Sequence, residues 1–392
     1  MVGPRVLVDL HAHYPMHLLP PEQGHTHKAL GRWESERFRA LIIRWLSILA
    51  NYQGPGNTPG VTVDRMRDGD VGAVLSVLYS PFDEIDLTKR YGAPPSAAYF
   101  QHLLDQLELV EDDIVENHND EAAVVRTPAE LDRTLAEGRI AFIHAVEGGF
   151  HLGASEEEVR HNVGVLAERG VAYVTVAHLF WRRVATNANA IPFVWDWLYR
   201  RLFPQPTSEG LTRLGKTAVA AMIEHGILVD ISHMSEAATA DTLALLDEHD
   251  PARRVPVLAT HVAYRFGKLQ YNLGSETVRR VIERKGVLGL IVCRHFIADG
   301  LPKPDSFKQS VELICKHIDR IRDHSPARSF DHVAIGSDLD GYIKPALNGI
   351  EHLGRMRALQ AALAERYGES AAHKVCSENA LRVLRAGWRQ SV

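Results

Sequence analysis

The chain has few cysteines, no excess of basic residues and no long apolar run. Three of its 392 residues are cysteines, Cys293, Cys315 and Cys376, and no two of them form a Cys-x-x-Cys pair. An odd number of cysteines without paired spacing argues against a disulfide framework. We therefore expect buried thiols in a reducing compartment.

Signals for export or membrane insertion are also missing. No apolar run approaches the roughly 18 residues that span a bilayer, and the first residues lack the features of a secretory signal. The formal net charge of −5 gives no general attraction to nucleic acid or anionic membranes. These absences favour a cytoplasmic protein that binds neither nucleic acid nor a membrane and acts on a small molecule or peptide.

The common motifs G-x-S-x-G, P-loop, strand-linked GxGxxG and H-E-x-x-H are absent too. What the chain does contain is a series of short apolar, β-branched runs without polar alternation. Such runs are typical of strands buried on both faces of a parallel sheet. Eight of them are found, at residues 5–11, 72–80, 140–147, 171–178, 227–233, 255–261, 286–293 and 332–338.

Helical patterns lie between these runs. Residues 211–226 and 311–324 repeat apolar side chains with helical spacing, and residues 377–388 predict a closing helix. Ser235 and Ser275 precede two further helical runs and are expected to cap them. Strands that alternate with helices predict an α/β protein, a (β/α)8 TIM-like barrel, with residues 1–392 forming a single domain.

The first two intervals between strands are much longer than most of the others, which indicates helical insertions after strands 1 and 2. Residues 17–52 form most of the first insertion, and residues 95–114 predict a helix in the second. We expect such helices over the mouth of the barrel. The segment 179–206, which contains tryptophan and arginine, either lines a pocket or packs as an amphipathic cover.

Six of the eight predicted strands end in a residue that can bind a metal or move a proton. They are His11, Glu147, His178, His233, His261 and Asp338. The carboxyl ends of barrel strands form the catalytic face, so these side chains should converge. The plainer alternative is that they cap backbone groups. Four imidazoles and two carboxylates without lysine or arginine are, however, the ligand set of metals such as zinc.

The first of these strands carries an H-x-H motif. His11 and His13 are two residues apart on an extended strand, so both point to the same face and can chelate. An H-x-H spacing arises about once by chance in a chain this rich in histidine. A second copy, His25 and His27, lies in a loop flanked by Pro and Gly, where solvated side chains are the simpler explanation.

Glu147 can bridge two metal ions through its two carboxylate oxygens, while Gly148 and Gly149 let the backbone turn sharply after it. His233 and His261 would complete the second site. We therefore expect two zinc ions per chain as cofactor. A single ion, or another divalent transition metal, is the alternative.

Hydrolysis at such a centre also needs a group that moves protons and one that stabilises an oxyanion. Asp338 is the candidate for proton transfer, because a carboxylate beside cations stays ionised. Asp340, two residues later, is a second candidate. His178 either hydrogen-bonds the oxyanion or is a core histidine bonded to the backbone.

A family pattern emerges from the order of these motifs. The segments "EGG", "YVTVAH", "GLTRLGKTAVAAMIEHGILVDISHMS", "PVLATH", "HVAIGSDLDG" and "NALRVL" resemble the renal (membrane) dipeptidase family of the amidohydrolase superfamily, across nearly the whole chain. The resemblance implies a barrel with a two-zinc centre that hydrolyses dipeptides and, in some members, other small amides.

By position, the resemblance implies that His11 is a ligand, that Glu147 bridges, and that His233 and His261 hold the second zinc. It also implies roles near the substrate, and these fall to His178, Asp338 and Asn187. His178 would contact the substrate or the oxyanion, Asp338 would act near the scissile nitrogen, and Asn187, in "TNANA", falls near a family asparagine.

Two positions depart from the family pattern. The family has H-x-D on strand one, and His13 replaces that aspartate, which removes a negative charge from the centre. After the sixth strand, family members often carry an arginine that can bind the substrate carboxylate, and Tyr271 stands in its place. Arg265 or Arg294 could substitute for it, or the substrate has a neutral end.

The leading hypothesis is a zinc-dependent hydrolase of dipeptides or similar small amides, in which metal-activated water attacks a carbonyl. Tyr271 and His13 prompt the main alternative, a barrel of the same kind acting on a lactone, a cyclic amide or an N-acyl amino acid. A non-catalytic metal-binding relative is the third. The apolar insertion helices permit a homodimer.

Overall fold

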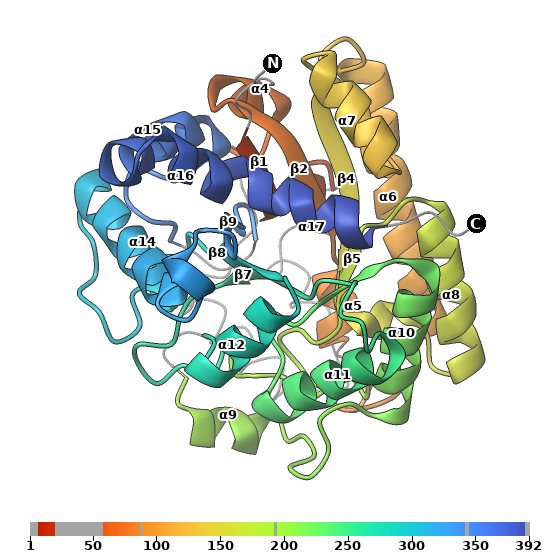
Figure 1. Cartoon of the computed structure of the whole chain (residues 1–392). Helices are drawn as coiled ribbons and strands as arrows, with labels where there is room; N and C mark the ends of the chain where they lie inside the picture. The colour runs from red at the N-terminus through yellow and green to blue at the C-terminus, as the bar shows by residue number, and fades with distance from the viewer. Residues whose placement is uncertain (1–6, 20–57, 87–88, 192–193, 342–344, 389–392) are drawn as a thin grey trace.

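The eight expected strands form a closed parallel barrel in the computed structural model, which describes residues 7–19, 58–86, 89–191, 194–341 and 345–388 (Figure 1). In chain order they are β1 (Leu7–Ala12), β2 (Val71–Leu78), β4 (Ile140–Glu147), β5 (Tyr173–Thr175), β6 (Leu228–Asp230), β7 (Leu258–Val262), β8 (Val287–Leu290) and β9 (Val333–Ile335). The ring closes because β2 pairs with both β1 and β4, while β9 pairs with β1 and β8. The predicted (β/α)8 barrel is therefore confirmed.

One further strand lies outside the ring. β3 (Ala122–Val124) pairs in parallel with the first residues of β4, beginning at Ala122 opposite Ile140. Its three residues, AAV, are too short to be recognised as a strand from the sequence, because a run of this length has no period.

Helices surround the barrel and connect its strands (Figure 1). The α-helices are α4 (Val63–Asp68), α5 (Pro81–Ile85), α6 (Ala97–Asn117), α7 (Pro128–Ala136), α8 (Glu156–Glu168), α9 (Asp196–Leu202), α10 (Arg213–His225), α11 (Glu236–His249), α12 (Ser275–Glu283), α13 (Arg294–Ile297), α14 (Phe307–Arg322), α15 (Met356–Tyr367), α16 (Glu369–His373) and α17 (Asn379–Gly387). The shorter helical turns are η1 (Tyr14–His17), η3 (Gly149–Leu152), η4 (Pro326–Arg328), η5 (Leu353–Arg355) and η6 (Lys374–Glu378).

Most of the helix ends follow local sequence signals. The α10 helix begins where the Thr212 side chain accepts a hydrogen bond from the Gly215 amide, and it ends at Gly226, whose φ of 71° is left-handed. Ser235 caps α11 as predicted, because its hydroxyl accepts from the Ala238 amide at 3.1 Å. The cap predicted at Ser275 is wrong: Ser275 is the first residue of α12, and Gly274 occupies the cap position.

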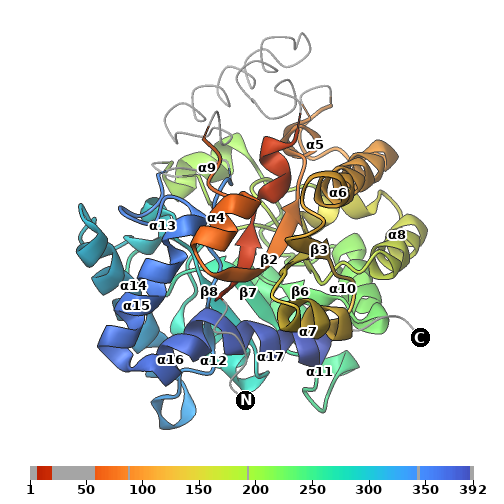
Figure 2. The same ribbon diagram turned by 90° about the horizontal axis from the view of Figure 1, so that it is seen from above.

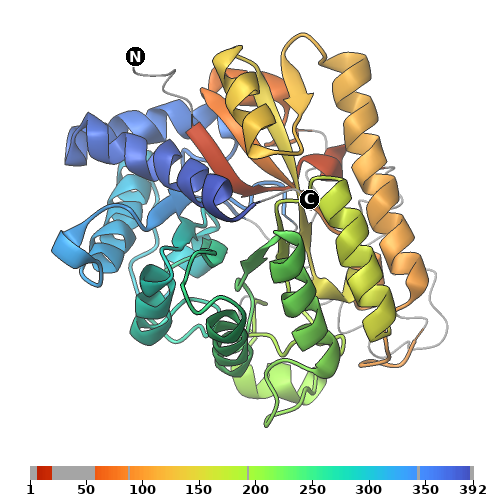
Figure 3. The same ribbon diagram turned by 45° about the vertical axis from the view of Figure 1, so that its right-hand side comes forward.

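The first predicted insertion, residues 17–52, lies mostly outside the described residues, as do His25 and His27. In the second insertion the expected helix is present as α6, but it does not cross the mouth of the barrel. It runs along the barrel wall beside α8, with Leu103, Leu107 and Val110 fully buried (Figure 3). An apolar stripe of this kind is stabilised by packing against the sheet rather than by covering an opening.

The closing helix α17 lies at the end of the barrel where the strands begin, opposite their carboxyl ends. Arg382 in α17 donates to the backbone carbonyls of Lys285 and Asp331, which precede β8 and β9. Figure 2 shows α17 at one end of the barrel and α5, α9 and α13 at the other. The carboxyl ends of the strands therefore open on the side of α5, α9 and α13.

The three cysteines are buried, as expected. Among the described residues, no helix combines the length and the apolar character needed to cross a bilayer.

Candidate metal centre

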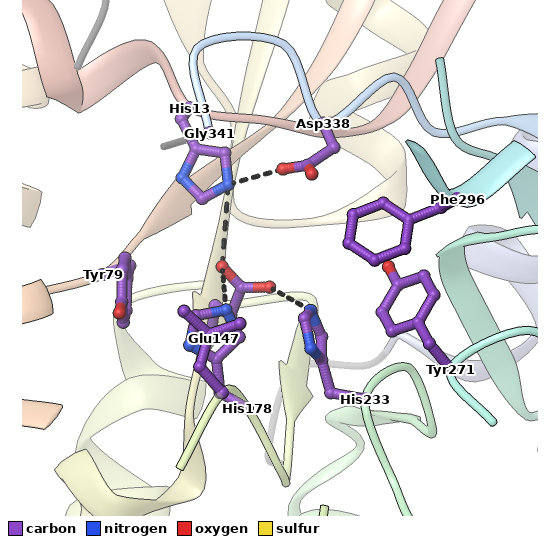
Figure 4. A pocket seen from close by; sticks show the side chains of 10 residues that line it. His13, Tyr79, Glu147, His178, His233, Tyr271, Phe296, Asp338 and Gly341 are labelled. Atoms are coloured by element: carbon purple, nitrogen blue, oxygen red, sulfur yellow. Dashed lines mark hydrogen bonds and ion pairs between the residues drawn. The ribbon is translucent and has the colours of Figure 1, made fainter. Parts of the chain in front are cut away.

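Side chains from around the barrel meet at the carboxyl ends of its strands. The glutamate that ends β4, Glu147, lies at the centre of this group, and Figure 4 shows His13, His178 and His233 turned toward its carboxylate. The group lines a cavity at the barrel mouth. The structure thus brings together the six polar strand-end residues predicted from the sequence, together with His13.

His11 and His13 face one side of the Glu147 carboxylate. The Nε2 atoms of the two imidazoles are 3.3 Å apart, and they lie 3.5 Å from Oε1 and 3.6 Å from Oε2 of Glu147, respectively. A tetrahedral ion with bonds of 2.0–2.1 Å has ligand atoms separated by about 3.3 Å. These three residues therefore have the spacing of ligands around one ion.

His233 and His261 form a second pair against the same carboxylate. Their Nε2 atoms lie 3.5 Å and 3.3 Å from Glu147 Oε1, and only 2.8 Å from each other. Within the described part of the chain, the buried Oε1 atom has no hydrogen-bond partner. An unpaired, buried carboxylate oxygen facing imidazole nitrogens is costly unless a cation satisfies it. The side chains around Glu147 therefore fit a bound metal cofactor.

The protonation states of Glu147, His11 and His233 also suit metal binding. Burial opposes the ionisation of Glu147, but the His178 and His11 imidazoles outweigh it and hold the pKa well below its usual range. Burial lowers the pKa of His11, and it lowers that of His233 to about 4. An ionised carboxylate and neutral imidazoles are the forms that bind metals.

Hydrogen bonds behind the imidazoles fix their direction. Nδ1 of His11 is 2.8 Å from the Tyr173 hydroxyl, and Nδ1 of His261 is 2.9 Å from the Thr260 hydroxyl. The Thr260 hydroxyl in turn donates to the buried Asp230 carboxylate at 2.7 Å. Such partners orient metal-binding imidazoles. Sequence reasoning missed all three, although Asp230 lies within the predicted strand 227–233, two residues before the "SH" motif.

Asp338 approaches the centre from the last strand. Its backbone has a left-handed φ of 58°, and its amide donates to the His11 carbonyl at 2.8 Å. The side-chain Oδ1 lies 3.1 Å from His13 Nε2. Asp340, by contrast, accepts from the amides of Gly60 and Val61 at 2.9 Å and 2.8 Å, so its carboxylate holds the backbone and does not line the cavity.

The structure places some of the predicted substrate-binding residues at the cavity and others away from it. Tyr271 lines the cavity, but its hydroxyl donates to the His261 carbonyl. The Arg265 guanidinium points elsewhere, since it donates to the Asn272 and Gln270 carbonyls and pairs with Glu236. Neither Arg265 nor Arg294 is among the described lining residues.

Asn187 also lies outside this lining. Its amide nitrogen donates to the Leu179 carbonyl at 2.8 Å and to the Tyr199 hydroxyl at 2.7 Å. It borders a separate cavity of about 380 Å³ together with other residues of the segment 179–206. Part of this segment thus lines a pocket, which was one of the two alternatives for it.

Sequence reasoning missed Glu84, a fully buried residue of α5. Its Oε2 accepts hydrogen bonds from His178 Nδ1 and from the Tyr79 hydroxyl, both at 2.7 Å. Although burial lowers the pKa of His178, the carboxylates of Glu147 and Glu84 raise it to about 9. The signal that could have found Glu84 is its place shortly after the carboxyl end of β2.

Comparison with known proteins places this arrangement in a family. The model of the membrane dipeptidase family, peptidase family M19, matches residues 7–389. Dipeptidase verJ of Clonostachys rogersoniana is 24% identical over 324 residues, which cover 82% of this chain and 74% of that protein.

Two solved structures have the same fold. One is dipeptidase AC, and the other is a metallopeptidase from Rhodobacter sphaeroides with a phosphinate mimic of the dipeptide L-Ala-D-Ala bound. Each is 22% identical and superposes with a TM-score of 0.70; the first match covers 98% of both chains, and the second covers 98% of this chain and 99% of the other. The match to the family model over nearly the whole length shows that this metal-dependent hydrolase belongs to the membrane dipeptidase family, peptidase family M19.

Proposed function

We propose that the protein is a two-zinc hydrolase of dipeptides or similar small amides, with the whole chain acting as one catalytic domain. The observation that carries the proposal is the Glu147 carboxylate between two pairs of imidazole Nε2 atoms at 3.3–3.6 Å. His11 and His13 would hold one ion, and His233 and His261 the other. The family match over residues 7–389 supports the single domain and the reaction class.

The proposed chemistry divides between the ions and the side chains around them. Bound divalent ions supply a water molecule of lowered pKa and polarise a substrate carbonyl. Asp338, whose side chain is 13% exposed, accepts a proton from the attacking water and returns it to the leaving nitrogen. His178 donates a hydrogen bond from Nε2, 3.3 Å from Glu147 Oε2, to the oxygen of the attacked carbonyl.

The wall of the cavity favours a small substrate with apolar groups. Tyr79 lies on one side, and Tyr271 and Phe296 lie on the other, with ring centroids 4.3 Å apart (Figure 4). Neither tyrosine hydroxyl is free to donate a hydrogen bond to a substrate, because one donates to Glu84 and the other to the His261 carbonyl.

The same wall supports a second candidate function. No lysine or arginine is found among the described residues that line the cavity, so a free carboxylate would meet Asp338 without a cation from these walls. This favours a substrate with a neutral end, such as a lactone, a cyclic amide or a blocked peptide. An N-acyl amino acid would instead need a cation from elsewhere.

One experiment tests both candidates. The zinc-loaded protein is assayed with matched free and C-terminally amidated dipeptides and with simple lactones. We expect hydrolysis of one of these groups, its loss after chelation, its return with added zinc, and a severe loss in His233→Ala. His102→Ala, which changes a histidine 51% exposed on α6, is the control. Full turnover after exhaustive chelation, or in His233→Ala, would contradict the metal-dependent mechanism.

A further inference from the structure

Glu84 is a charged residue buried beside the metal centre without being turned toward the bridging carboxylate. Its side chain is 0% exposed. Oε2 accepts from His178 Nδ1 and from the Tyr79 hydroxyl at 2.7 Å each, and Oε1 accepts from the Phe180 amide at 2.8 Å. Both oxygens therefore have protein donors, which is how a buried carboxylate is tolerated.

These contacts determine which nitrogen of His178 faces the cavity. An ionised carboxylate can accept hydrogen bonds but cannot donate them, so Nδ1 of His178 must carry the proton. Nε2 is then the nitrogen that points at Glu147, 3.3 Å from its Oε2. Turning the ring over would break the bond to Glu84 and leave its charge with fewer donors.

Glu84 also connects two loops that meet at the mouth of the barrel. It lies in α5, which follows β2, whereas His178 and Phe180 belong to the segment that follows β5. The Arg182 guanidinium donates to the backbone carbonyl of Glu84, which adds a second connection between the same segments. The position of His178 is therefore set by a residue of another loop and not only by its own strand.

His178 differs in this respect from two of the histidines expected to bind metal. In the described part of the chain, Nδ1 of His13 and Nδ1 of His233 have no hydrogen-bond partner. A carboxylate partner on the far nitrogen is a device that fixes the tautomer and the ring direction of a working imidazole. The structure provides it for His178, which lines the cavity.

From these contacts we propose that Glu84 is the positioning residue of His178: it accepts from Nδ1–H, fixes the direction of the ring and so holds Nε2–H toward the carbonyl oxygen of the substrate. The proposal rests on the proposed function, in which His178 contacts that oxygen. Glu84 itself is not among the described residues that line the cavity.

The kinetic test compares Glu84→Gln with Asp83→Asn in the zinc-loaded enzyme. Glu84→Gln keeps the size of the side chain, but the new amide can donate as well as accept, so it no longer forces Nδ1–H of His178 to face it and no longer fixes the direction of the ring. We expect kcat to fall by about 10- to 100-fold with KM and the metal content per chain unchanged. Asp83 is the matched control, because this neighbouring carboxylate pairs with His102 Nδ1 at 2.9 Å and does not reach His178.

A second measurement does not depend on the reaction or on the folding of Glu84→Gln. In the unmutated zinc-loaded protein labelled with ¹⁵N-histidine, we expect a hydrogen-bonded Nδ1–H resonance that is absent from His178→Gln. A His178 ring with a bare Nδ1 would overturn the proposal even if the enzyme hydrolyses dipeptides. If the unmutated protein hydrolyses nothing, the proposed function fails, and this spectrum still decides whether Glu84 fixes the ring.

The remaining outcomes are also decisive. An unchanged kcat in folded Glu84→Gln would overturn the proposal, and so would a loss of zinc in proportion to the loss of activity, since Glu84 would then act through the metal centre. An equal fall of kcat in Asp83→Asn would do the same, because any carboxylate of α5 would then serve.

Discussion

At the scale of single residues, His317 shows how burial fixes the charge of an imidazole that is not part of the metal centre. It lies in α14 and is fully buried. Nδ1 accepts from the Tyr264 amide at 3.1 Å, and Nε2 donates to the Ile297 carbonyl at 2.8 Å. Burial lowers the pKa of His317 to about 4, despite the opposing bond to Ile297. The neutral ring joins α14 to the segments after β7 and β8.

This pKa makes folding stability depend on pH. The unfolded chain takes up the proton near pH 6.5, before the folded protein does. The contribution of His317 to the free energy of unfolding is therefore fully present above about pH 6.5 and is lost as the pH falls toward about 4. The lowering of the His317 pKa corresponds to roughly 3 kcal/mol of folding free energy. We predict that His317→Gln is destabilised at about pH 7.5 by roughly 1–3 kcal/mol, and that its difference from the unmutated protein shrinks by about pH 5.

Urea unfolding at the two pH values measures this difference, with His102→Gln as the control, because His102 is half exposed. A gap between His317→Gln and the unmutated protein that stays constant as the pH falls would show that His317 is not held neutral.

Some residues of the candidate site could be predicted from the sequence, and others could not. His11, Glu147 and Asp338 follow from their places at strand ends, since every such end faces the same side of a barrel. Glu84 and Tyr173 could not be found in this way. They act through the far nitrogens of His178 and His11, and those contacts depend on side-chain directions across the barrel.

At the scale of elements, Ser235 and Ser275 have the same sequence signal but different roles. Ser235 caps α11 through the Ala238 amide and also bonds the Thr186 hydroxyl at 2.6 Å. Ser275 begins α12, and its hydroxyl lies 2.7 Å from the Tyr264 hydroxyl instead. A partner from another segment thus competes with the local cap, and no local pattern reports that partner.

We predict that Ser235→Ala loses about 1 kcal/mol of stability and that the Ala238 amide then exchanges its hydrogen faster, because its acceptor is gone. In Ser275→Ala, the amide three residues on, Val278, should exchange at its original rate. Hydrogen exchange resolved by residue, together with urea unfolding, measures both effects. Faster exchange at Val278 in Ser275→Ala would show that Ser275 does cap α12.

Sequence periodicity predicted the elements better than their placement. The stripe of α6 was recognised, yet its position along the barrel wall was not, because the same apolar face could have covered the mouth. Which surface it meets depends on the neighbours of β2 and β4 in the closed ring. The eight main strands were found because each is a continuous apolar run between polar boundaries.

At the scale of the whole molecule, the candidate metal centre joins segments distant in the sequence. His11 comes from β1 and Glu147 from β4, while His233 follows β6 and His261 lies in β7. These four side chains are at most 6% exposed, and their metal-binding atoms face one another across 2.8–3.5 Å. Ions that bind here would therefore stabilise the folded barrel as a whole.

We predict that the thermal midpoint of the chelated protein rises by several degrees when zinc is added. An ion that binds the folded state adds about 2.7 kcal/mol when its free concentration is about 100 times Kd. Two ions should be found per chain by elemental analysis. In His233→Ala we expect one ion to be lost together with part of the rise, because His11 and His13 still face Glu147. In His102→Ala both the count and the rise should stay unchanged. If His233→Ala keeps two ions and the full rise, the second pair of histidines is not a metal site, and the stabilising ions bind elsewhere on the chain.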